Sequence, residues 1–118
     1  MEMQVAVDPG TRFTRCTVSG RVDLEHAQRL LREFAASRPE AMPRRLLLDL
    51  LGVTGDLQVT EQYSVGTIST DAFRDFSRVA VVQAPRTNNG FAALVAKNRG
   101  LNIEVFETEA AALSWLLQ

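Results

Sequence analysis

Few side chains in this sequence are of the types that catalysis requires. His26 is the single histidine, and it could act as a general base, but the pattern implies no serine or cysteine nucleophile beside it. We expect a partly exposed histidine on a helix surface. Cys16, the single cysteine, falls in an alternating segment where a small core residue is expected. We therefore predict no catalytic residue, no metal site and no cofactor, since one histidine and one cysteine do not make a structural zinc site.

Asp49 lies inside the apolar run 46–51 and is the strongest candidate for a covalent step. It could accept a phosphoryl group, as the aspartate of a receiver domain does. A receiver also needs an acidic pair after its first strand and a lysine after its fifth. Asp8 stands alone, and residues 103–107 contain no lysine. We therefore expect a structural Asp49 that accepts hydrogen bonds from N–H groups of the loop 52–55.

A polar stretch opens a predicted helix at the carboxyl end of an apolar strand. Free N–H groups and the helix dipole favour an anion at such a position, and Arg86 would add to the field. Arg86, Thr87, Asn88 and Asn89 are therefore a candidate anion site. No glycine-rich phosphate-binding pattern accompanies them, so plain capping of the helix is the preferred interpretation.

Charge and composition point away from several classes of protein. The chain has 118 residues and a formal net charge of −1, which provides no electrostatic attraction for nucleic acid or an anionic membrane. The N-terminal residues are not basic and no long apolar run follows them, so we predict no signal peptide and no membrane span. We expect one domain of a bacterial-type cytoplasmic protein.

The elements that must position these residues follow from hydrophobic periodicity. The run 45–50 is apolar almost throughout, which is typical of a strand buried on both faces. Residues 24–35 place apolar side chains at helical spacing after Asp23, a favourable N-cap, and Pro39 ends that helix. The remaining patterns predict strands at 4–7, 13–18, 79–84 and 103–106, and helices at 60–72, from 87–89 to 98, and from 108 to 117.

The predicted order of elements is β-β-α-β-α-β-α-β-α. Strands that alternate with helices favour a mostly parallel sheet with right-handed crossovers, and the turn at 8–10 favours a hairpin at the start. We therefore predict a single α/β domain, residues 1–118, with a mixed, mostly parallel sheet of four to five strands covered by about four helices. Around the helix 60–72, one face gathers Val65, Ile68 and Ala72, and another gathers Val59 and Tyr63.

Several stretches of the chain resemble the STAS fold of anti-sigma-factor antagonists. Residues 18–23, from Val18 to Asp23, are similar to the family's approach to its first helix. Residues 46–53 are similar to its central strand and the following loop. Residues 78–82 and 105–116 resemble the divergent STAS-like branch that is grouped with Sec14-type lipid-binding folds. The resemblance implies a STAS-like domain over nearly the whole chain.

The same resemblance implies a partner-facing surface where the helix after the central strand begins. Antagonists of this family carry Asp-Ser-Ser-Gly there, and a partner kinase phosphorylates one of the serines. Here the stretch 54–60 contains no serine, so the kinase switch is not carried over. Asp56 already places a permanent carboxylate near the expected helix start. The candidate partner-facing residues are Thr54, Gly55, Asp56, Gln58 and Thr60.

We therefore predict a non-enzymatic, STAS-like interaction or regulatory module whose partner is another protein. A homodimer is left open. The alternative is a small carrier that binds an apolar or acyl ligand between the helices and the sheet. Phe73, Phe76 and Trp115 are its candidate lining residues, although such aromatic side chains more often belong simply to the core.

Overall fold

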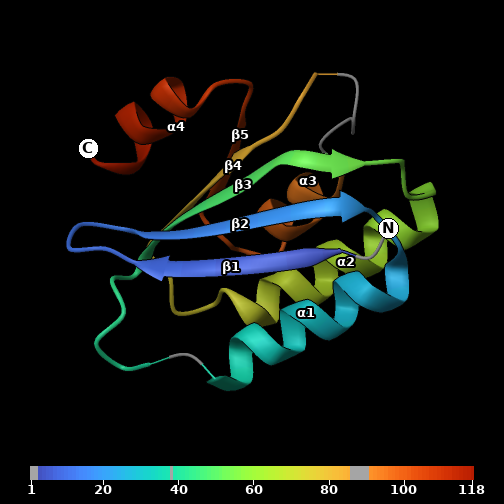
Figure 1. Ribbon diagram of the computed structural model, residues 1–118, viewed down its shortest axis with the longest axis horizontal. Coiled ribbons are helices and arrows are strands. Elements are labelled where there is room, and N and C mark those ends of the chain that lie inside the picture. The colour runs from blue at the N-terminus through green and yellow to red at the C-terminus, as the bar shows by residue number, and fades with distance from the viewer. Residues whose placement is uncertain (1–2, 38, 86–90) are drawn as a thin grey trace.

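The computed structural model describes residues 3–37, 39–85 and 91–118. Its strands and helices follow the predicted order (Figure 1). The elements are β1 (Gln4–Pro9), β2 (Thr14–Arg21), α1 (Leu24–Ser37), β3 (Arg45–Thr54), α2 (Val59–Ala72), β4 (Arg78–Val82), α3 (Phe91–Asn98), β5 (Ile103–Phe106) and α4 (Glu109–Leu116).

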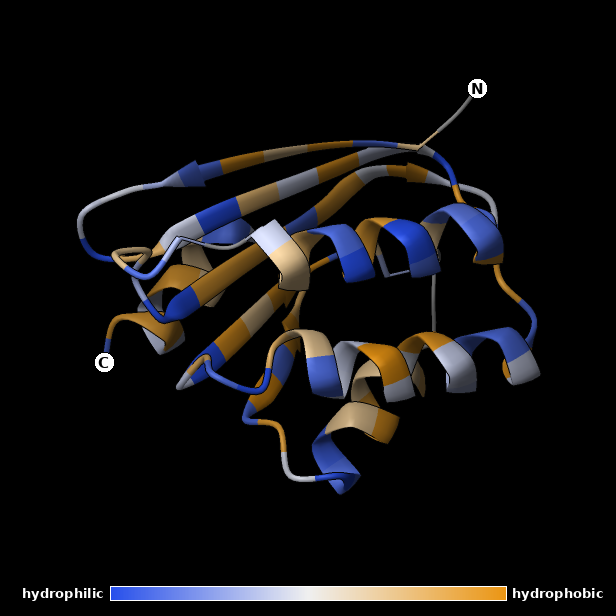
Figure 2. Cartoon of the chain, turned by 90° about the horizontal axis from the view of Figure 1, so that it is seen from below, coloured by the Kyte–Doolittle hydropathy of each residue, from blue (hydrophilic) through white to orange (hydrophobic). Residues whose placement is uncertain are grey.

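One five-stranded sheet, in the order β1-β2-β3-β4-β5, organises the fold. β1 runs antiparallel to β2, and all other neighbouring strands are parallel. The helices α1, α2 and α3 lie on one face of this sheet, and α4 lies on the other (Figures 1 and 2). The predicted mixed, mostly parallel α/β domain with an N-terminal hairpin is therefore confirmed.

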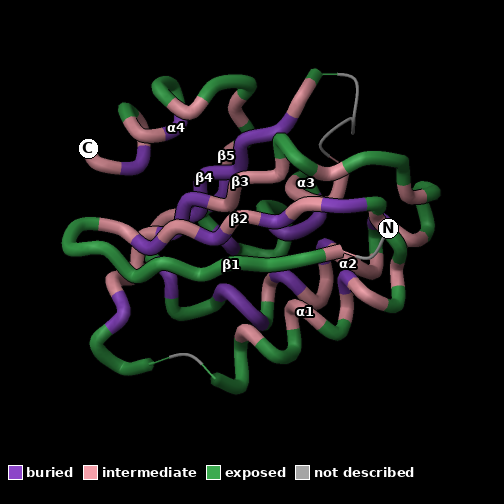
Figure 3. Tube along the Cα trace, viewed as in Figure 1, coloured by how far each residue is buried: buried purple, intermediate pink, exposed green. Residues whose placement is uncertain are grey.

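β4 is buried at every residue after Arg78 and β3 is buried at Leu46 and Leu47, whereas β1 is exposed along its length (Figure 3). Leu46 and Leu47 are neighbours in β3 and are both fully buried, although they point to opposite faces. Leu46 packs in the core beneath α2 and α3, and Leu47 packs against Ala112 and Leu116 of α4. Each face of the sheet has its own apolar cover, which explains why the run is apolar almost throughout.

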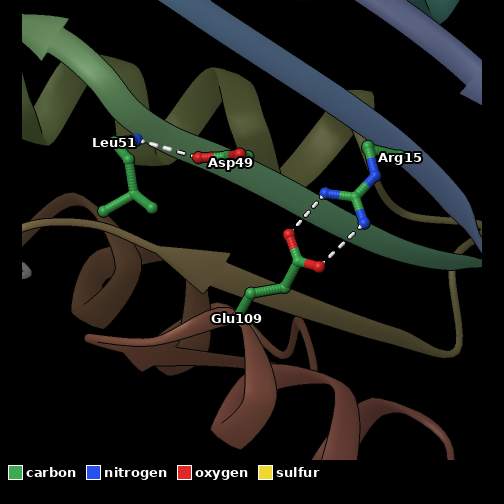
Figure 4. A network of polar contacts seen from close by, with 4 residues as sticks. All are labelled: Arg15, Asp49, Leu51 and Glu109. Carbon is green, nitrogen blue, oxygen red and sulfur yellow. Dashed lines mark hydrogen bonds and ion pairs between the residues drawn. The ribbon is translucent and has the colours of Figure 1, made fainter.

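β3 continues to Thr54, beyond the predicted end at residue 50. Its register against β2 shifts after Asp49, so β3 contains a bulge. The Asp49 carboxylate accepts a hydrogen bond from the Leu51 N–H at 3.0 Å (Figure 4). The expectation that Asp49 would serve the loop 52–55 is therefore wrong, because a bulge leaves a strand N–H without a ladder partner and Asp49 satisfies it locally.

Two arginines at the beginning of neighbouring strands hold the end of α4. Arg45 Nη1 donates to the Leu116 and Gln118 carbonyl oxygens at 2.8 Å and 3.0 Å. Arg78 Nη1 donates to the Trp115 carbonyl oxygen at 2.5 Å, and its guanidinium lies 5.2 Å from the centre of the Trp115 ring. Cations at the last carbonyls of a helix complement its dipole, so both arginines stabilise α4 against the sheet.

A single glycine sets the distance between α2 and α3. A Cβ atom added to Gly66 would lie 2.5 Å from the Ala92 carbonyl oxygen and 2.8 Å from Val95 Cβ. Only a residue without a side chain permits that approach. Gly66, which weakens α2 as an isolated helix, is therefore a point of close contact between the two helices.

Candidate functional site

The connection between β3 and α2 brings the five predicted partner-facing residues into one exposed segment. All five are exposed: Thr54, Gly55 and Asp56 lie before α2, and Gln58 and Thr60 lie at its start. The Thr54 carbonyl oxygen accepts a hydrogen bond from the Val22 N–H at 2.8 Å, which ties this segment to the approach of α1. Gly55 has φ of +79°, a left-handed conformation that favours glycine. The segment is thus held in a defined shape at the surface.

The side chains of Glu61 and Gln62 hold the start of α2, and the sequence analysis did not identify either of them. Gln58 is the N-cap, and its N–H donates to Glu61 Oε1 at 2.9 Å. The Gln62 side chain donates through Nε2 to the Leu57 carbonyl oxygen at 2.9 Å. Asp56 lies before the cap, so Glu61 is the carboxylate in the first turn of the helix. Glu61 takes the place of the N3 acid of a capping box, but Gln58 is not one of the favoured N-cap residues, so no usual sequence signal marks this start.

Two large apolar side chains follow on the outside of α2. Val59 is 58% exposed and Tyr63 is 51% exposed. Their spacing of four residues places them on one face of the helix, immediately after the exposed connection. Sequence periodicity grouped these two residues but did not show that they are exposed. Adjacent exposed apolar side chains beside a shaped polar loop are typical of an interaction surface.

An apolar cavity of about 160 Å³, partly open to solvent, lies between the sheet and the helices, directly behind this connection. Leu57, Gly55 and Asp56 of the connection contribute to its wall. Other parts of the wall come from α1, α2, α3 and the sheet, and include Ala27, Phe34, Val65, Ala93, Val18 and Val81. The cavity and the candidate partner-facing segment therefore share residues.

The predicted aromatic lining of such a cavity is only partly correct. Phe73 lines the cavity. Phe76 is buried in the same core as Phe73 but does not line the cavity, and its ring packs with those of Phe73 and Phe34. Trp115 lies on the opposite face of the sheet beside Phe106, with ring centres 5.8 Å apart. Trp115 is therefore not a lining residue but packs against the core beneath α4, because α4 lies on the other face of the sheet, which helical spacing alone does not reveal.

Cys16 also lines the cavity and is buried, as predicted for a small core residue. Burial raises the pKa of its thiol to about 11, because the thiolate would lose its hydration. The thiol is therefore neutral at physiological pH and is a poor nucleophile. Its position makes it part of an apolar wall.

His26 is paired within the first turn of α1. Its Nδ1 atom contacts the Asp23 carboxylate, whose other oxygen accepts a hydrogen bond from the Glu25 N–H at 3.0 Å. The hydrogen bond with His26 holds the pKa of Asp23 below its usual value. Asp23 thus caps α1 as predicted, and His26 lies partly exposed on the helix surface.

The ion pair drawn in Figure 4 links β2 to α4. Arg15 donates through both terminal nitrogens to the two carboxylate oxygens of Glu109. This hydrogen bonding lowers the pKa of Glu109 and raises that of Arg15, with further help from the charge of Asp49. A two-point contact of this kind positions a helix and leaves no free acid or base.

Within the described ranges, no three His, Cys, Asp or Glu residues gather in a way that could hold a metal ion. In the same ranges, no helix is long and apolar enough to cross a membrane. The candidate anion site, Arg86, Thr87, Asn88 and Asn89, lies outside the described residues.

Solved structures show the same fold. An anti-sigma factor antagonist from Mycobacterium paratuberculosis aligns with a TM-score of 0.70 and 18% identity, over 99% of this chain and 96% of that one. An uncharacterized protein of the DUF3478 family with a SpoIIAA-like fold, from Shewanella loihica, aligns with a TM-score of 0.58 and 19% identity, over 97% of this chain and 93% of that one. No curated protein matches the chain.

The family model described as SpoIIAA-like matches residues 13–117, which span every element from β2 to α4. The matched range includes the predicted approach to α1, the central strand β3 and the C-terminal helix. The expected STAS-like relationship is therefore confirmed, and the chain belongs to the SpoIIAA-like family.

Proposed function

We propose that this protein is a non-enzymatic interaction module that binds a partner protein through the β3–α2 connection and the outer face of α2. The observation that carries the proposal is the exposure of Val59 and Tyr63 directly after the shaped segment 54–58. An aromatic anchor beside polar, hydrogen-bonding groups is the composition that protein interfaces favour. The similar structure from Mycobacterium paratuberculosis is named an anti-sigma factor antagonist, which supports a protein partner.

We further propose that binding is not switched by phosphorylation at the start of α2. The segment 54–60 offers Thr54 and Thr60 but no serine. Ser64 follows one turn later, and its hydroxyl donates to the Thr60 carbonyl oxygen at 3.3 Å along the helix. The fixed charge of Asp56 and the Glu61 carboxylate at the cap already occupy the position where a phosphate would act. A permanent charge cannot be toggled, so the surface is set for constitutive binding.

The alternative of an acyl carrier receives less support from the dimensions of the cavity. A cavity of about 160 Å³ is close to the engineered cavity of about 150 Å³ that accommodates benzene. A long acyl chain would fill this space and extend beyond it. The interaction surface therefore remains the better-supported function. A cytoplasmic location stays a prediction from the sequence.

Capture of partners by paired variants tests the proposal. The variant Val59→Ser/Tyr63→Ser truncates the proposed anchors, and Leu51→Ser is the matched control, because Leu51 is also 51% exposed but lies in β3. A cell lysate from the source organism is passed over immobilised wild-type protein and both variants. We expect at least one protein that wild type and Leu51→Ser retain and that the double variant retains about tenfold less, equivalent to ~1.4 kcal/mol. Equal capture by all three would reject this surface.

A further inference from the structure

We propose that two copies of this chain associate through the outer edge of β1, which pairs antiparallel with β1 of the second copy and joins the two sheets. The surface consists of that edge and of a groove between β1 and α1. It uses other elements than the start of α2, so the inference goes beyond the proposed function and does not rest on it.

β1 lies at an edge of the sheet (Figure 1). It pairs with β2 on one side, and in the described part of the chain no strand pairs with its other side. All six of its residues are exposed, and the side chains of Val5 and Val7 are each 40% exposed. An exposed edge strand presents free N–H and C=O groups that template pairing with a further strand. This edge is therefore available for the addition of a strand.

The hairpin determines which backbone groups of β1 point outward. The Gly10 N–H donates to the Phe13 carbonyl oxygen at 3.1 Å, so these two residues form a hydrogen-bonded pair of the antiparallel ladder. Such pairs alternate along the ladder, and the register of β1 against β2 has no shift. The N–H and C=O groups of Val5 and Val7 therefore point away from β2. Pro9 also falls at an outward position, where its missing N–H removes no bond from the ladder.

A groove beneath the edge defines which side chains an added strand needs. The groove has a volume of about 390 Å³ and is lined by Val5 and Val7 of β1 and by Leu30 and Phe34 of α1. Paired residues of neighbouring strands point to the same face of a sheet, so alternate side chains of an added strand lie over this groove. The apolar lining favours a strand with apolar residues at those alternate positions.

The sequence of β1 itself meets these requirements. In an antiparallel pair of two β1 strands centred on Ala6, Val5 of each copy lies opposite Val7 of the other. These are the residues with outward N–H and C=O groups, so each pair of valines makes two hydrogen bonds. The valine side chains of both copies lie over the grooves. The contact is the same on both copies, so it closes as a dimer and leaves no edge of β1 free.

The polar residues of β1 favour the same register. Gln4 and Asp8 lie on the face of β1 opposite the valines, and pairing about Ala6 places Gln4 of one copy opposite Asp8 of the other. The Gln4 amide can then donate to the Asp8 carboxylate. Pairing centred on Asp8 would instead place two carboxylates opposite each other, which is destabilising. Hydrogen bonding and charge therefore select the register centred on Ala6.

Cysteine cross-linking of the full chain tests this register. Ala6→Cys carries its thiol at the two-fold axis, where opposite Cα atoms lie about 4.5 Å apart, within the range of a disulfide. Gln4→Cys is the matched control, because its two copies would lie about 13 Å apart along the strands, too far to bridge. We expect mild oxidation to give at least about tenfold more interchain dimer with Ala6→Cys. The native Cys16 is buried in both variants.

Sedimentation equilibrium from about 1 μM to about 1 mM protein tests association without a cross-link. We expect the average mass to rise toward that of a dimer. Val7→Pro removes an outward N–H and leaves the β1–β2 ladder intact, so it should stay folded and monomeric. Val7→Ala keeps the N–H and is the matched control, which should still dimerise. Circular dichroism shows whether each variant is folded.

Charge changes at Gln4 test the contact with Asp8 of the second copy. Gln4→Lys should tighten the dimer about threefold or more at low salt, and Gln4→Glu should weaken it by a similar factor. Within one copy, Gln4 and Asp8 are about 13 Å apart along the strand, so these effects report on the contact between copies. The same two changes at Ser114, which is exposed on α4, should have no effect.

Either of two results would overturn the inference. One is a chain that stays monomeric at about 1 mM. The other is cross-linking of Ala6→Cys that does not exceed cross-linking of Gln4→Cys, or a dimer that the Gln4 variants leave unchanged, since both reject this register. If Val7→Pro does not fold, the cysteine and Gln4 variants still decide. None of these measurements involves partner capture, so the dimer and the proposed interaction surface fail independently.

Discussion

Arg15 and Glu109 are 94 positions apart in the chain, yet their side chains form a two-point ion pair with N–O distances of 2.6 Å and 3.1 Å. The contact reaches from β2 across to the first turn of α4 (Figure 4). It joins the N-terminal end of α4 to the sheet, while Arg45 and Arg78 hold its C-terminal end. Both ends of this helix are therefore positioned by arginines from the sheet.

The Arg15–Glu109 pair predicts a pH-dependent contribution to stability. Hydrogen bonding by Arg15 lowers the pKa of Glu109 in the folded protein below the ordinary value of 4.5. A carboxylate with a lowered folded pKa stabilises the fold above its unfolded pKa, and this contribution disappears as pH falls through the folded pKa. Glu109→Gln should therefore lower the free energy of unfolding by ~0.2–1 kcal/mol at pH 7, since both groups are partly exposed.

Urea denaturation at pH 7 and pH 3 measures this contribution. At pH 3 the difference between wild type and Glu109→Gln should be smaller than at pH 7. Glu107→Gln, two residues earlier and exposed, is the matched control and should change little at either pH. A Glu109→Gln effect that grows as the pH falls would contradict the assigned ion pair.

Leu47 and Leu51 lie in the same strand but should respond very differently to truncation. Leu47 is fully buried against α4, whereas Leu51 is half exposed. Leu47→Ala should lower the free energy of unfolding by ~2–5 kcal/mol through lost burial and a residual cavity. Leu51→Ala should cost less than ~1 kcal/mol. Chemical denaturation of both variants measures these changes. Equal losses in the free energy of unfolding would contradict the burial of β3 on both faces of the sheet.

Gly66→Ala separates local helix propensity from tertiary packing. Alanine at an interior helix position normally stabilises a helix by ~0.5–1 kcal/mol relative to glycine. Here the added Cβ would lie 2.5 Å from the Ala92 carbonyl oxygen, so α2 and α3 would have to move apart. We expect a net loss of ~1–3 kcal/mol, the usual range for overpacking. A raised melting temperature would show that the two helices do not approach as closely as described.

Hydrophobic periodicity was sufficient for the order of elements and for the central strand, because burial on both faces leaves a run that is apolar almost throughout. It was insufficient for the end of β3, since the bulge after Asp49 lets the strand continue past the apolar run to Thr54. It also did not show which face α4 covers, and Trp115 lies on the face of the sheet opposite the cavity.

The sequence alone indicated where the candidate segment lies, although its role as a partner-facing surface stays a prediction. The resemblance in the sequence indicated the segment 54–60, and the structure describes it as one exposed connection. The exposure of Val59 and Tyr63 depends on how α2 is rotated about its axis, which α3 and Gly66 determine. The cavity depends on the spacing between helices and sheet, which involves many distant residues, and no local pattern encodes such a distance.

The central claim is that the surface at the start of α2 binds its partner without being modified. Two measurements test it most directly. In the first, the protein is titrated with the captured partner by calorimetry, once untreated and once after incubation with that partner and ATP. In the second, intact-mass analysis shows whether the incubated protein has been modified. We predict the same affinity in both titrations and an unchanged mass for the segment 52–66. A stoichiometric phosphorylated species mapping to Thr54, Thr60 or Ser64, with binding lost, would contradict the account.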